Sequence, residues 1–527
     1  MKKIIGFFKK NKWAETALTA LAALVFPLLM CVIFCAVKGQ SIADVFLPAG
    51  EWNDELFYFK QVEGIVNYLY PRGYFGFNES RADMLSFAAW SPVLVTFWVV
   101  WGIVFGWNLL SPVICNIVLL SIASCLFVLL TKMKAKDLIP LGLMMVSFTP
   151  FTRYMLSGMP EIICFSMVIL FAGLAVNYLS KEKVWKLVLL FVMAGFMTLM
   201  RPYLFLFFIL PAFLSIKKYK AKGIIATLLA GVPSIAVYAF IKIKLSAEYL
   251  TPLYYTNWIT DFFDKGIVEG FHNLIYRIYA MCLNIADYMK SGIISGLCAG
   301  AIFAAFIILF VIMIIRFVSD IIKYKKDKKT ENKNKLIIEG HFIFVMFGMF
   351  SAIVLMYKLT EGSKHLLTFL ALGVFLLTLF HGKYYIENIV LVLAFSFFFI
   401  IKADSAYDYE VPFKNDYICA KTDEWGKAFD ENIDLKEDTL GYDNVVIWDF
   451  YDTKDGVAQP IKWQYLYMLP KGMGISCCDP EFVKNNLETL QSKYIVTLTG
   501  SEVDSLCEQS GRELLHRDEE LSFYRLR

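Results

Sequence analysis

Apolar blocks long enough to cross a lipid bilayer are the feature that most constrains this chain. Clear examples run from Leu18 to Val37, from Ser291 to Ile315 and from His365 to Leu379, and a membrane-spanning helix needs about 20 residues. Of the 527 residues, 58% are hydrophobic and 19% are charged, whereas soluble domains are about half apolar and about a quarter charged. Because backbone groups in lipid must be hydrogen-bonded within their own segment, we predict that these blocks are transmembrane helices.

The first apolar block follows a basic stretch that contains Lys2, Lys3, Lys9 and Lys10. Its apolar run is longer than that of a secretory signal, and no convincing small-x-small cleavage site follows it. We therefore expect a membrane anchor that is retained in the protein.

Lysine clusters in the loops predict which side of the membrane each loop faces, because cytoplasmic loops collect Lys and Arg. The clusters are the N-terminus, Lys132 to Lys136, Lys181 to Lys186, Lys217 to Lys222 and Lys323 to Lys335. Placing all of them in the cytoplasm requires an even number of crossings between consecutive clusters.

The apolar stretch from Phe87 to Gly106 does not fit that requirement. It contains Trp90, Trp98, Trp101 and a Ser91-Pro92 step, and tryptophan is favoured at the membrane interface. We interpret it as a helix at the outer interface. The alternative is a true span, with the orientation of the remaining chain reversed.

The other apolar stretches then give about eleven crossings, with the N-terminus cytoplasmic and the C-terminus extracytoplasmic in a multi-pass protein of the plasma membrane. The predicted spans are Ala14 to Val37, Leu109 to Leu130, Asp137 to Pro150, Glu161 to Leu179, Val184 to Met200, Pro202 to Ile216, Gly223 to Ile243, Gly292 to Val318, Ile337 to Tyr357, His365 to Phe380 and Ile386 to Ile401.

The predicted fold class is an α-helical polytopic membrane protein with a small C-terminal extracytoplasmic α/β domain. Residues 1–402 form the membrane domain, with long outer loops at 38–86 and 246–291, and residues 403–527 form the outer domain. In this tail, strand patterns alternate with helix patterns, which indicates an α/β fold. The predicted elements are strands at Val445 to Trp448, Tyr494 to Leu498 and Leu521 to Leu526, and helices at Pro480 to Gln491 and Glu502 to Gln509.

Carboxylates on the outer side are the candidate catalytic residues. Asp54 and Glu55 are adjacent near the start of the first outer loop, and Glu161 begins a predicted span. Paired acids beside low-dielectric lipid repel each other, which raises the pKa of one and suits a base that works near neutral pH. The alternatives are a solvated surface pair for Asp54 and Glu55, and a favourable helix N-terminal charge for Glu161.

Cations on the same outer side are candidate phosphate-binding residues. Lys364 and His365 begin a late span, Arg201 lies between two spans, and Arg153 precedes Glu161. Lys and Arg are the usual partners of phosphate groups, although for any one of them snorkelling or contact with a lipid headgroup is the better explanation. The net charge of +4 comes from short loops rather than from one basic stripe, so we expect no nucleic-acid partner.

The layout of these features resembles the GT-C superfamily of membrane glycosyltransferases, especially the branch of protein O-mannosyltransferases and lipid A aminoarabinose transferases. The residues that carry the resemblance are Asn53-Asp54-Glu55, the Ser91-Pro92 helix that ends at Phe105-Gly106, the Arg153 to Glu161 segment, Leu199-Met200-Arg201-Pro202, Lys364-His365-Leu366-Leu367 and Ser522-Phe523-Tyr524-Arg525-Leu526. The late span begins with Lys364-His365 where relatives commonly have Arg-Tyr. No Trp-Trp-Asp signature is present, which argues against the oligosaccharyltransferase branch.

The resemblance implies transfer of a sugar from a polyprenyl-phosphate donor to a glycan, lipid or protein acceptor at the cell surface, with inversion at the anomeric carbon. It implies Asp54 as the general base, Glu55 and Glu161 as residues that shape the acceptor site or hold a divalent cation such as Mg²⁺ or Mn²⁺, and Lys364 with Arg201 at the donor phosphate. A transporter or flippase of lipid-linked sugars and a non-catalytic membrane scaffold remain the alternatives.

Overall fold

The computed structural model describes residues 12–71, 75–80, 90–247, 257–290, 294–327, 330–356, 359–402, 410–436, 441–449, 451–454, 457–460 and 462–527. Within these ranges, eight helical segments are long and apolar enough to cross a membrane. They are α2 (Lys12–Val37), α5 (Ser111–Thr131), α8 (Glu161–Ser180), η5 (Pro202–Phe208) continued by α10 (Ile209–Tyr219), α11 (Ala221–Phe240) continued by η6 (Ile241–Leu245), α14 (Ile294–Asp327), α15 (Thr330–Met356), and η7 (Gly382–Tyr384) continued by α17 (Tyr385–Lys402). The chain is therefore a polytopic α-helical membrane protein, as predicted.

Three of the eleven predicted spans differ from these eight. Helices α9 (Val184–Met200) and α16 (Leu359–Phe380) form where expected, but their apolar parts are shorter. The predicted span from Asp137 to Pro150 is not one helix. It consists of η4 (Ala135–Leu138), α6 (Ile139–Ser147) and α7 (Thr149–Met155). The break falls at Phe148, two residues before Pro150, because proline removes a backbone donor and clashes with the preceding turn.

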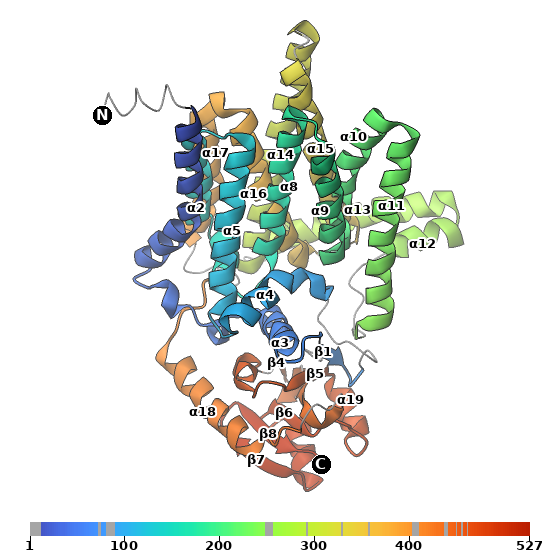
Figure 1. The fold of residues 1–527 in the computed structure, drawn as a ribbon. Coiled ribbons are helices and arrows are strands. Elements are labelled where there is room, and N and C mark those ends of the chain that lie inside the picture. The colour runs from blue at the N-terminus through green and yellow to red at the C-terminus, as the bar shows by residue number, and fades with distance from the viewer. Residues whose placement is uncertain are drawn as a thin grey trace.

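The predicted interfacial helix is a short helical segment. The structure describes it from residue 90 onward, as η3 (Pro92–Val95) followed by α4 (Thr96–Phe105), and residues 87–89 lie outside the described part. At 1.5 Å per residue, fourteen helical residues reach about 21 Å, which is less than the hydrocarbon thickness of about 30 Å. In Figure 1, α4 lies at the end of the bundle beside the C-terminal domain.

The second predicted outer loop is mainly helical. It contains α12 (Asn257–Asp264) and α13 (Ile267–Lys290), which run across the direction of the spans in Figure 1. Large apolar side chains such as Phe263, Val268 and Ile275 are exposed on these helices.

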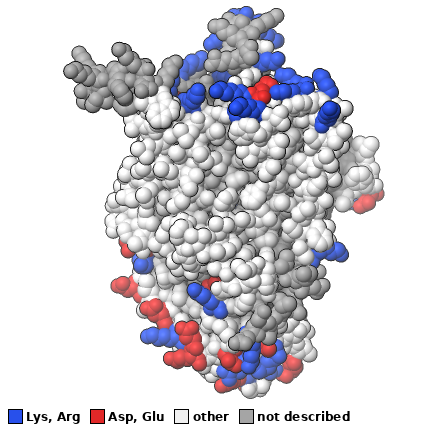
Figure 2. Space-filling view, in the orientation of Figure 1, with Lys and Arg blue, Asp and Glu red and all other residues white. Residues whose placement is uncertain are grey.

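Charged side chains gather at the two ends of the molecule and leave an uncharged belt between them (Figure 2). The end opposite the C-terminal domain, where α14 and α15 meet, carries mostly Lys and Arg (Figure 2). The end formed by the C-terminal domain carries both signs. The positive-inside rule predicts that the basic end faces the cytoplasm.

The C-terminal domain is built around a six-stranded sheet in the order β1-β5-β2-β6-β8-β7. Strands β5 (Gly474–Cys478), β2 (Val445–Asp449) and β6 (Tyr494–Leu498) are parallel, and β8 (Leu521–Arg525) and β7 (Glu513–Arg517) continue the sheet antiparallel. A second, two-stranded sheet contains β3 (Tyr451–Lys454) and β4 (Val457–Pro460). The helices are α18 (Asp416–Asn432), η9 (Tyr442–Asn444), η10 (Gln464–Met468), α19 (Pro480–Asn486) and α20 (Glu502–Gln509).

The edge strand β1 (Phe75–Phe77) comes from the first outer loop, not from the tail. It pairs in parallel with β5, with Gly76 opposite Ser476. The backbone of residues 44–46 also joins the tail, because Phe46 N donates to Pro412 O (2.7 Å) and Lys414 N donates to Asp44 O (2.8 Å). The division of the chain at residue 402 stays a prediction, but the first outer loop and the tail share one sheet.

A buried carboxylate fixes this connection. Glu79 is 8% exposed, and its oxygens accept the backbone N–H groups of Gln491 (2.9 Å) and Ser492 (2.7 Å). The Tyr442 hydroxyl donates to the carbonyl oxygen of Glu79 (2.6 Å). The two hydrogen bonds to the Glu79 carboxylate are charge-assisted, and such bonds are roughly twice as strong as hydrogen bonds between neutral groups.

Helix α3 (Asn53–Tyr68) lies between the helical bundle and the sheet (Figure 1). The acidic first turn, with Asp54 and Glu55, is favourable at a helix N-terminus because of the helix dipole. On one side, Trp107 Nε1 donates to Phe59 O (3.1 Å). On the other side, Lys60 Nζ donates to Leu469 O (2.9 Å).

We predict that Glu79→Gln destabilises the junction between the outer loop and the tail. The amide replaces a charged acceptor of two backbone N–H groups, and a hydrogen bond to a charged group contributes about 1.5–3 kcal/mol. Thermal unfolding and limited proteolysis of the purified protein measure the change. The matched control is Glu488→Gln, which removes a surface ion pair with Arg512 that is expected to contribute less than about 1 kcal/mol. Equal stability of the two variants would contradict the assigned role of Glu79.

Candidate functional site

The N-terminus of α3 and the N-terminal part of α16 meet in one ion pair. Lys364 Nζ lies 2.7 Å from Asp54 Oδ2, although 310 residues separate the two in sequence. The Asp54 side chain is 40% exposed and the Lys364 side chain is 20% exposed. This pair is therefore open to solvent, in contrast to the buried pairs described next.

A buried polar network lies next to that pair. Arg201 donates from Nη2 to Glu161 Oε1 (2.7 Å) and from Nη1 to His365 Nδ1 (2.8 Å) and the Tyr203 hydroxyl (2.9 Å). Because a guanidinium has no acceptor, His365 must accept at Nδ1, which places the proton of a neutral imidazole on Nε2. The guanidinium also lies over the ring of Trp90, 5.2 Å from its centroid.

The local sequence explains why these groups meet. Arg201 directly follows α9 and precedes Pro202, so the chain turns there between two helices. Glu161 is the first residue of α8, directly after Pro160. His365 follows Lys364 in α16, so the exposed pair and the buried network share a helix turn.

A second buried pair lies on the other side of Asp54. Glu55 accepts from Arg153 Nη1 (2.8 Å), and both side chains are at most 1% exposed. The guanidinium of Arg153 lies 4.0 Å from the ring centroid of Trp52, and Trp52 stacks on Tyr154. Burial raises the pKa of Glu55, while the charge of Arg153 opposes that shift.

The structure thus arranges all seven residues predicted from the sequence as linked pairs: Asp54 with Lys364, Glu55 with Arg153, and Glu161 with Arg201 and His365. Their roles in catalysis and in phosphate binding stay predictions. The aromatic residues Trp52, Trp90 and Tyr203 were not predicted to belong to the site. Trp52 and Tyr203 stand close to selected residues in the sequence, and that proximity was the available signal.

The three acids do not fit a shared divalent cation. Glu55 and Glu161 are each neutralised by a buried arginine, and Asp54 pairs with Lys364. Among the described residues, the group of His, Cys, Asp and Glu side chains with ligand atoms close enough for a metal ion is Asp320, Glu339 and His381, at another place in the fold. A divalent cation held by Glu55 and Glu161 is therefore not part of the chemistry proposed for this site.

Comparisons with known proteins find similarity to solved structures only. No protein-family model matches the chain, and no curated protein matches it. Among solved structures, the chain is similar to ArnT from Cupriavidus metallidurans bound to undecaprenyl phosphate, with 10% identity, a TM-score of 0.49 and coverage of 96% of this chain and 98% of that chain. It is also similar to the oligosaccharyltransferase from Archaeoglobus fulgidus in the apo form, with 13% identity, a TM-score of 0.45 and coverage of 93% of this chain and 70% of that chain.

With identities of 10–13% and TM-scores below 0.5, these similarities assign neither a family, a substrate nor a site to this protein.

We predict that the Glu161–Arg201 pair is essential for stability. Glu161→Gln leaves Arg201 buried without its counter-ion, and breaking a buried pair in this way costs about 3–5 kcal/mol. Thermal unfolding in detergent measures the loss. The control is Glu182→Gln, because the Glu182–Lys218 pair joins the same helical domain but is exposed (53% and 35%) and is expected to contribute less than about 1 kcal/mol. The double variant Glu161→Gln/Arg201→Gln should recover part of the stability. If the Glu161 and Glu182 variants lost equal stability, burial would not decide the contribution of these pairs.

Proposed function

We propose that this protein is a membrane glycosyltransferase that moves a sugar from a polyprenyl-phosphate donor to a hydroxyl-bearing acceptor at the extracytoplasmic face. The observation that carries the proposal is the solvent-accessible Asp54–Lys364 pair beside the buried Arg201 and His365. A carboxylate and two cations, Lys364 and Arg201, lie together there, at the end of the bundle next to the C-terminal domain. The acceptor belongs to a glycan, a lipid or a protein.

The proposed reaction is an inverting displacement. The acceptor oxygen attacks the anomeric carbon, the bond from that carbon to the phosphate oxygen breaks, and polyprenyl phosphate leaves with the electron pair. Asp54 takes the proton of the acceptor hydroxyl. Asp54 suits this role better than Glu55 or Glu161, because its side chain is 40% exposed while theirs are 0% and 3% exposed.

Cations are required for the leaving phosphate, because they stabilise the charge that develops as the bond breaks. Lys364 is the proposed first contact, since a bound phosphate would replace Asp54 as the partner of its ammonium group. Arg201 adds a second positive charge, because it contacts His365, the residue after Lys364. Its Nε and Glu161 Oε2 have no hydrogen-bond partner among the described residues, and a buried polar atom without a partner costs free energy. A phosphate or sugar hydroxyl at this end would supply such partners.

Glu55 and Arg153 are proposed as positioning residues. Their buried ion pair joins the first turn of α3 to α7. Because Asp54 precedes Glu55, the pair fixes the backbone from which the proposed base extends. Arg153 is consequently removed from direct contact with the donor in this proposal, which differs from the phosphate-binding role expected from the sequence.

We predict that Asp54→Asn lowers kcat by about 10²–10⁴-fold, because general-base catalysis contributes that much. The full-length protein is reconstituted in liposomes and given polyprenyl-phosphate sugars with a panel of glycan, lipid and peptide acceptors. Asn keeps the shape of Asp54 and leaves Lys364 in place. The matched control is Glu51→Gln, an exposed acid three residues earlier, which should leave transfer unchanged.

The same assay separates the alternative functions. Transfer at the normal rate by Asp54→Asn would remove Asp54 as the base. Movement of the lipid-linked sugar across the bilayer without transfer, in the unmodified protein, would favour a flippase over an enzyme. If the protein neither transferred nor moved the sugar of any donor tested, a non-catalytic scaffold would be favoured.

A further inference from the structure

A second cluster of ionisable side chains lies at the other end of α16. Asp320 belongs to α14, Glu339 belongs to α15, and His381 directly follows α16. His381 lies 17 residues after Lys364, which corresponds to about 25 Å along a helix. The cluster is therefore separate from the site at Asp54.

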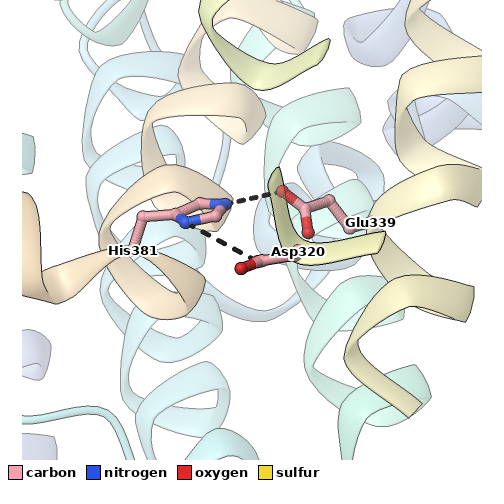
Figure 3. Close-up of side chains that lie close together, drawn as sticks. All are labelled: Asp320, Glu339 and His381. Atoms are coloured by element: carbon pink, nitrogen blue, oxygen red, sulfur yellow. Dashed lines mark hydrogen bonds and ion pairs between the residues drawn. The ribbon is translucent and has the colours of Figure 1, made fainter. Parts of the chain in front are cut away.

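Figure 3 shows the His381 ring beside both carboxylates. The distance from His381 Nε2 to Glu339 Oε1 is 2.6 Å, and the distance from His381 Nδ1 to Asp320 Oδ2 is 3.9 Å. One ligand atom from each of the three residues lies within 4.8 Å of the others. In a tetrahedral zinc site, with bonds of about 2.0–2.1 Å, ligand atoms are about 3.3 Å apart. Because one His381 nitrogen serves as the ligand and the three ligand atoms lie within 4.8 Å of one another, side-chain shifts of up to about 1.5 Å would bring them to that spacing.

An independent observation favours a cation-binding site at this cluster. Glu339 is 1% exposed and His381 is 2% exposed. The second carboxylate oxygen of Glu339, Oε2, has no hydrogen-bond partner among the described residues, and in Figure 3 it lies on the side of Asp320. A buried carboxylate oxygen without a partner is costly, so the position favours a bound positive charge.

The cations already present do not satisfy that oxygen. Lys335 pairs with Asp320, and Arg316 donates to Asn388 (2.8 Å). The ammonium group of Lys335 contacts Asp320 Oδ2, an oxygen that a metal ion would need as a ligand. The side chain of Lys335 is therefore a competitor for the site, not a ligand.

We propose that Asp320, Glu339 and His381 bind one divalent transition-metal ion, for which Zn²⁺ is the best match. An imidazole nitrogen with two carboxylates suits zinc better than Mg²⁺ or Ca²⁺, which prefer oxygen ligands alone. The ion accepts the lone pair of one His381 nitrogen, and the proton shared by His381 and Glu339 is released to water. Water completes the coordination. Because the three ligands come from α14, α15 and the end of α16, the ion is structural and joins these elements.

We predict that the full-length protein binds one Zn²⁺ per chain. The protein, purified with a tag that contains no histidine, is stripped with a chelator and titrated with ZnCl₂. Metal content and the unfolding temperature are measured. Zn²⁺ should raise the unfolding temperature, and His381→Ala should weaken binding by more than about tenfold, since loss of even a second-shell partner costs 10–100-fold. A chain that binds no Zn²⁺ would overturn the proposal.

Lys335→Met separates a metal site from an ion-pair network, even if His381→Ala fails to fold. Removal of the competing ammonium group should tighten Zn²⁺ binding, so that added Zn²⁺ raises the unfolding temperature more than in the unmodified protein. The matched control is Lys333→Met, an exposed lysine two residues earlier, which should not change the affinity. If Lys335→Met only lowered the unfolding temperature and gave no larger response to Zn²⁺, the cluster would be an ion-pair network without a metal.

Discussion

The buried ion pair between Glu55 and Arg153 is the interaction on which the rest of the outer site depends. It fixes the first turn of α3 against α7, and α3 in turn lies between the helical bundle and the sheet. Two charges with at most 1% exposure persist in such a position only when each satisfies the other, because removal of either partner leaves a buried charge. The position of Asp54 follows from this pair, since Asp54 is the preceding residue of the same helix turn.

The outer domain depends on the same loop. Strand β1 extends the sheet of the tail, and Glu79 accepts two backbone N–H groups from the tail. Together with α3, these contacts join the described parts of the first outer loop to the C-terminal domain. Helix α3 is therefore held both to the helical bundle, through Glu55 and Arg153, and to the C-terminal domain, through Lys60.

The sequence predicted the parts of the fold that arise from local physics. Apolar length identified the spans, and α8, α9 and α20 form at or within one residue of the predicted bounds. The sequence did not predict β1, because three residues with the sequence Phe-Gly-Phe become a strand only through pairing with β5, about 400 residues later. Strand β5 was missed for a related reason, since Gly474-Ile-Ser-Cys-Cys lacks the run of β-branched residues that identifies β2 and β6. Helix α18 was also not predicted, because most of its residues are polar or charged and its buried face is short, at Thr422, Trp425 and Phe429.

The candidate site was predictable by residue type but not by pairing. Asp54 and Glu55 were selected as paired acids beside the lipid, Glu161 as an acid at membrane depth, and the cations as partners for phosphate. Which acid meets which cation depends on the tertiary arrangement: Asp54 meets Lys364, and Glu161 meets Arg201. The break at Phe148 shows the same limit, because Pro150 was visible in the sequence but the apolar run around it suggested one continuous span.

The contrast between exposed and buried pairs explains how one site holds both fixed and exchangeable charges. Water screens the exposed Asp54–Lys364 pair, so exchange of its partner costs about 1 kcal/mol or less. The buried Glu161–Arg201 pair loses about 3–5 kcal/mol when it is broken, and it therefore stays intact as a ligand enters. A phosphate would displace the weak pair and leave the strong pair in place. Such an event would free the Asp54 carboxylate only when the donor is bound, which couples the appearance of the proposed base to the presence of its substrate.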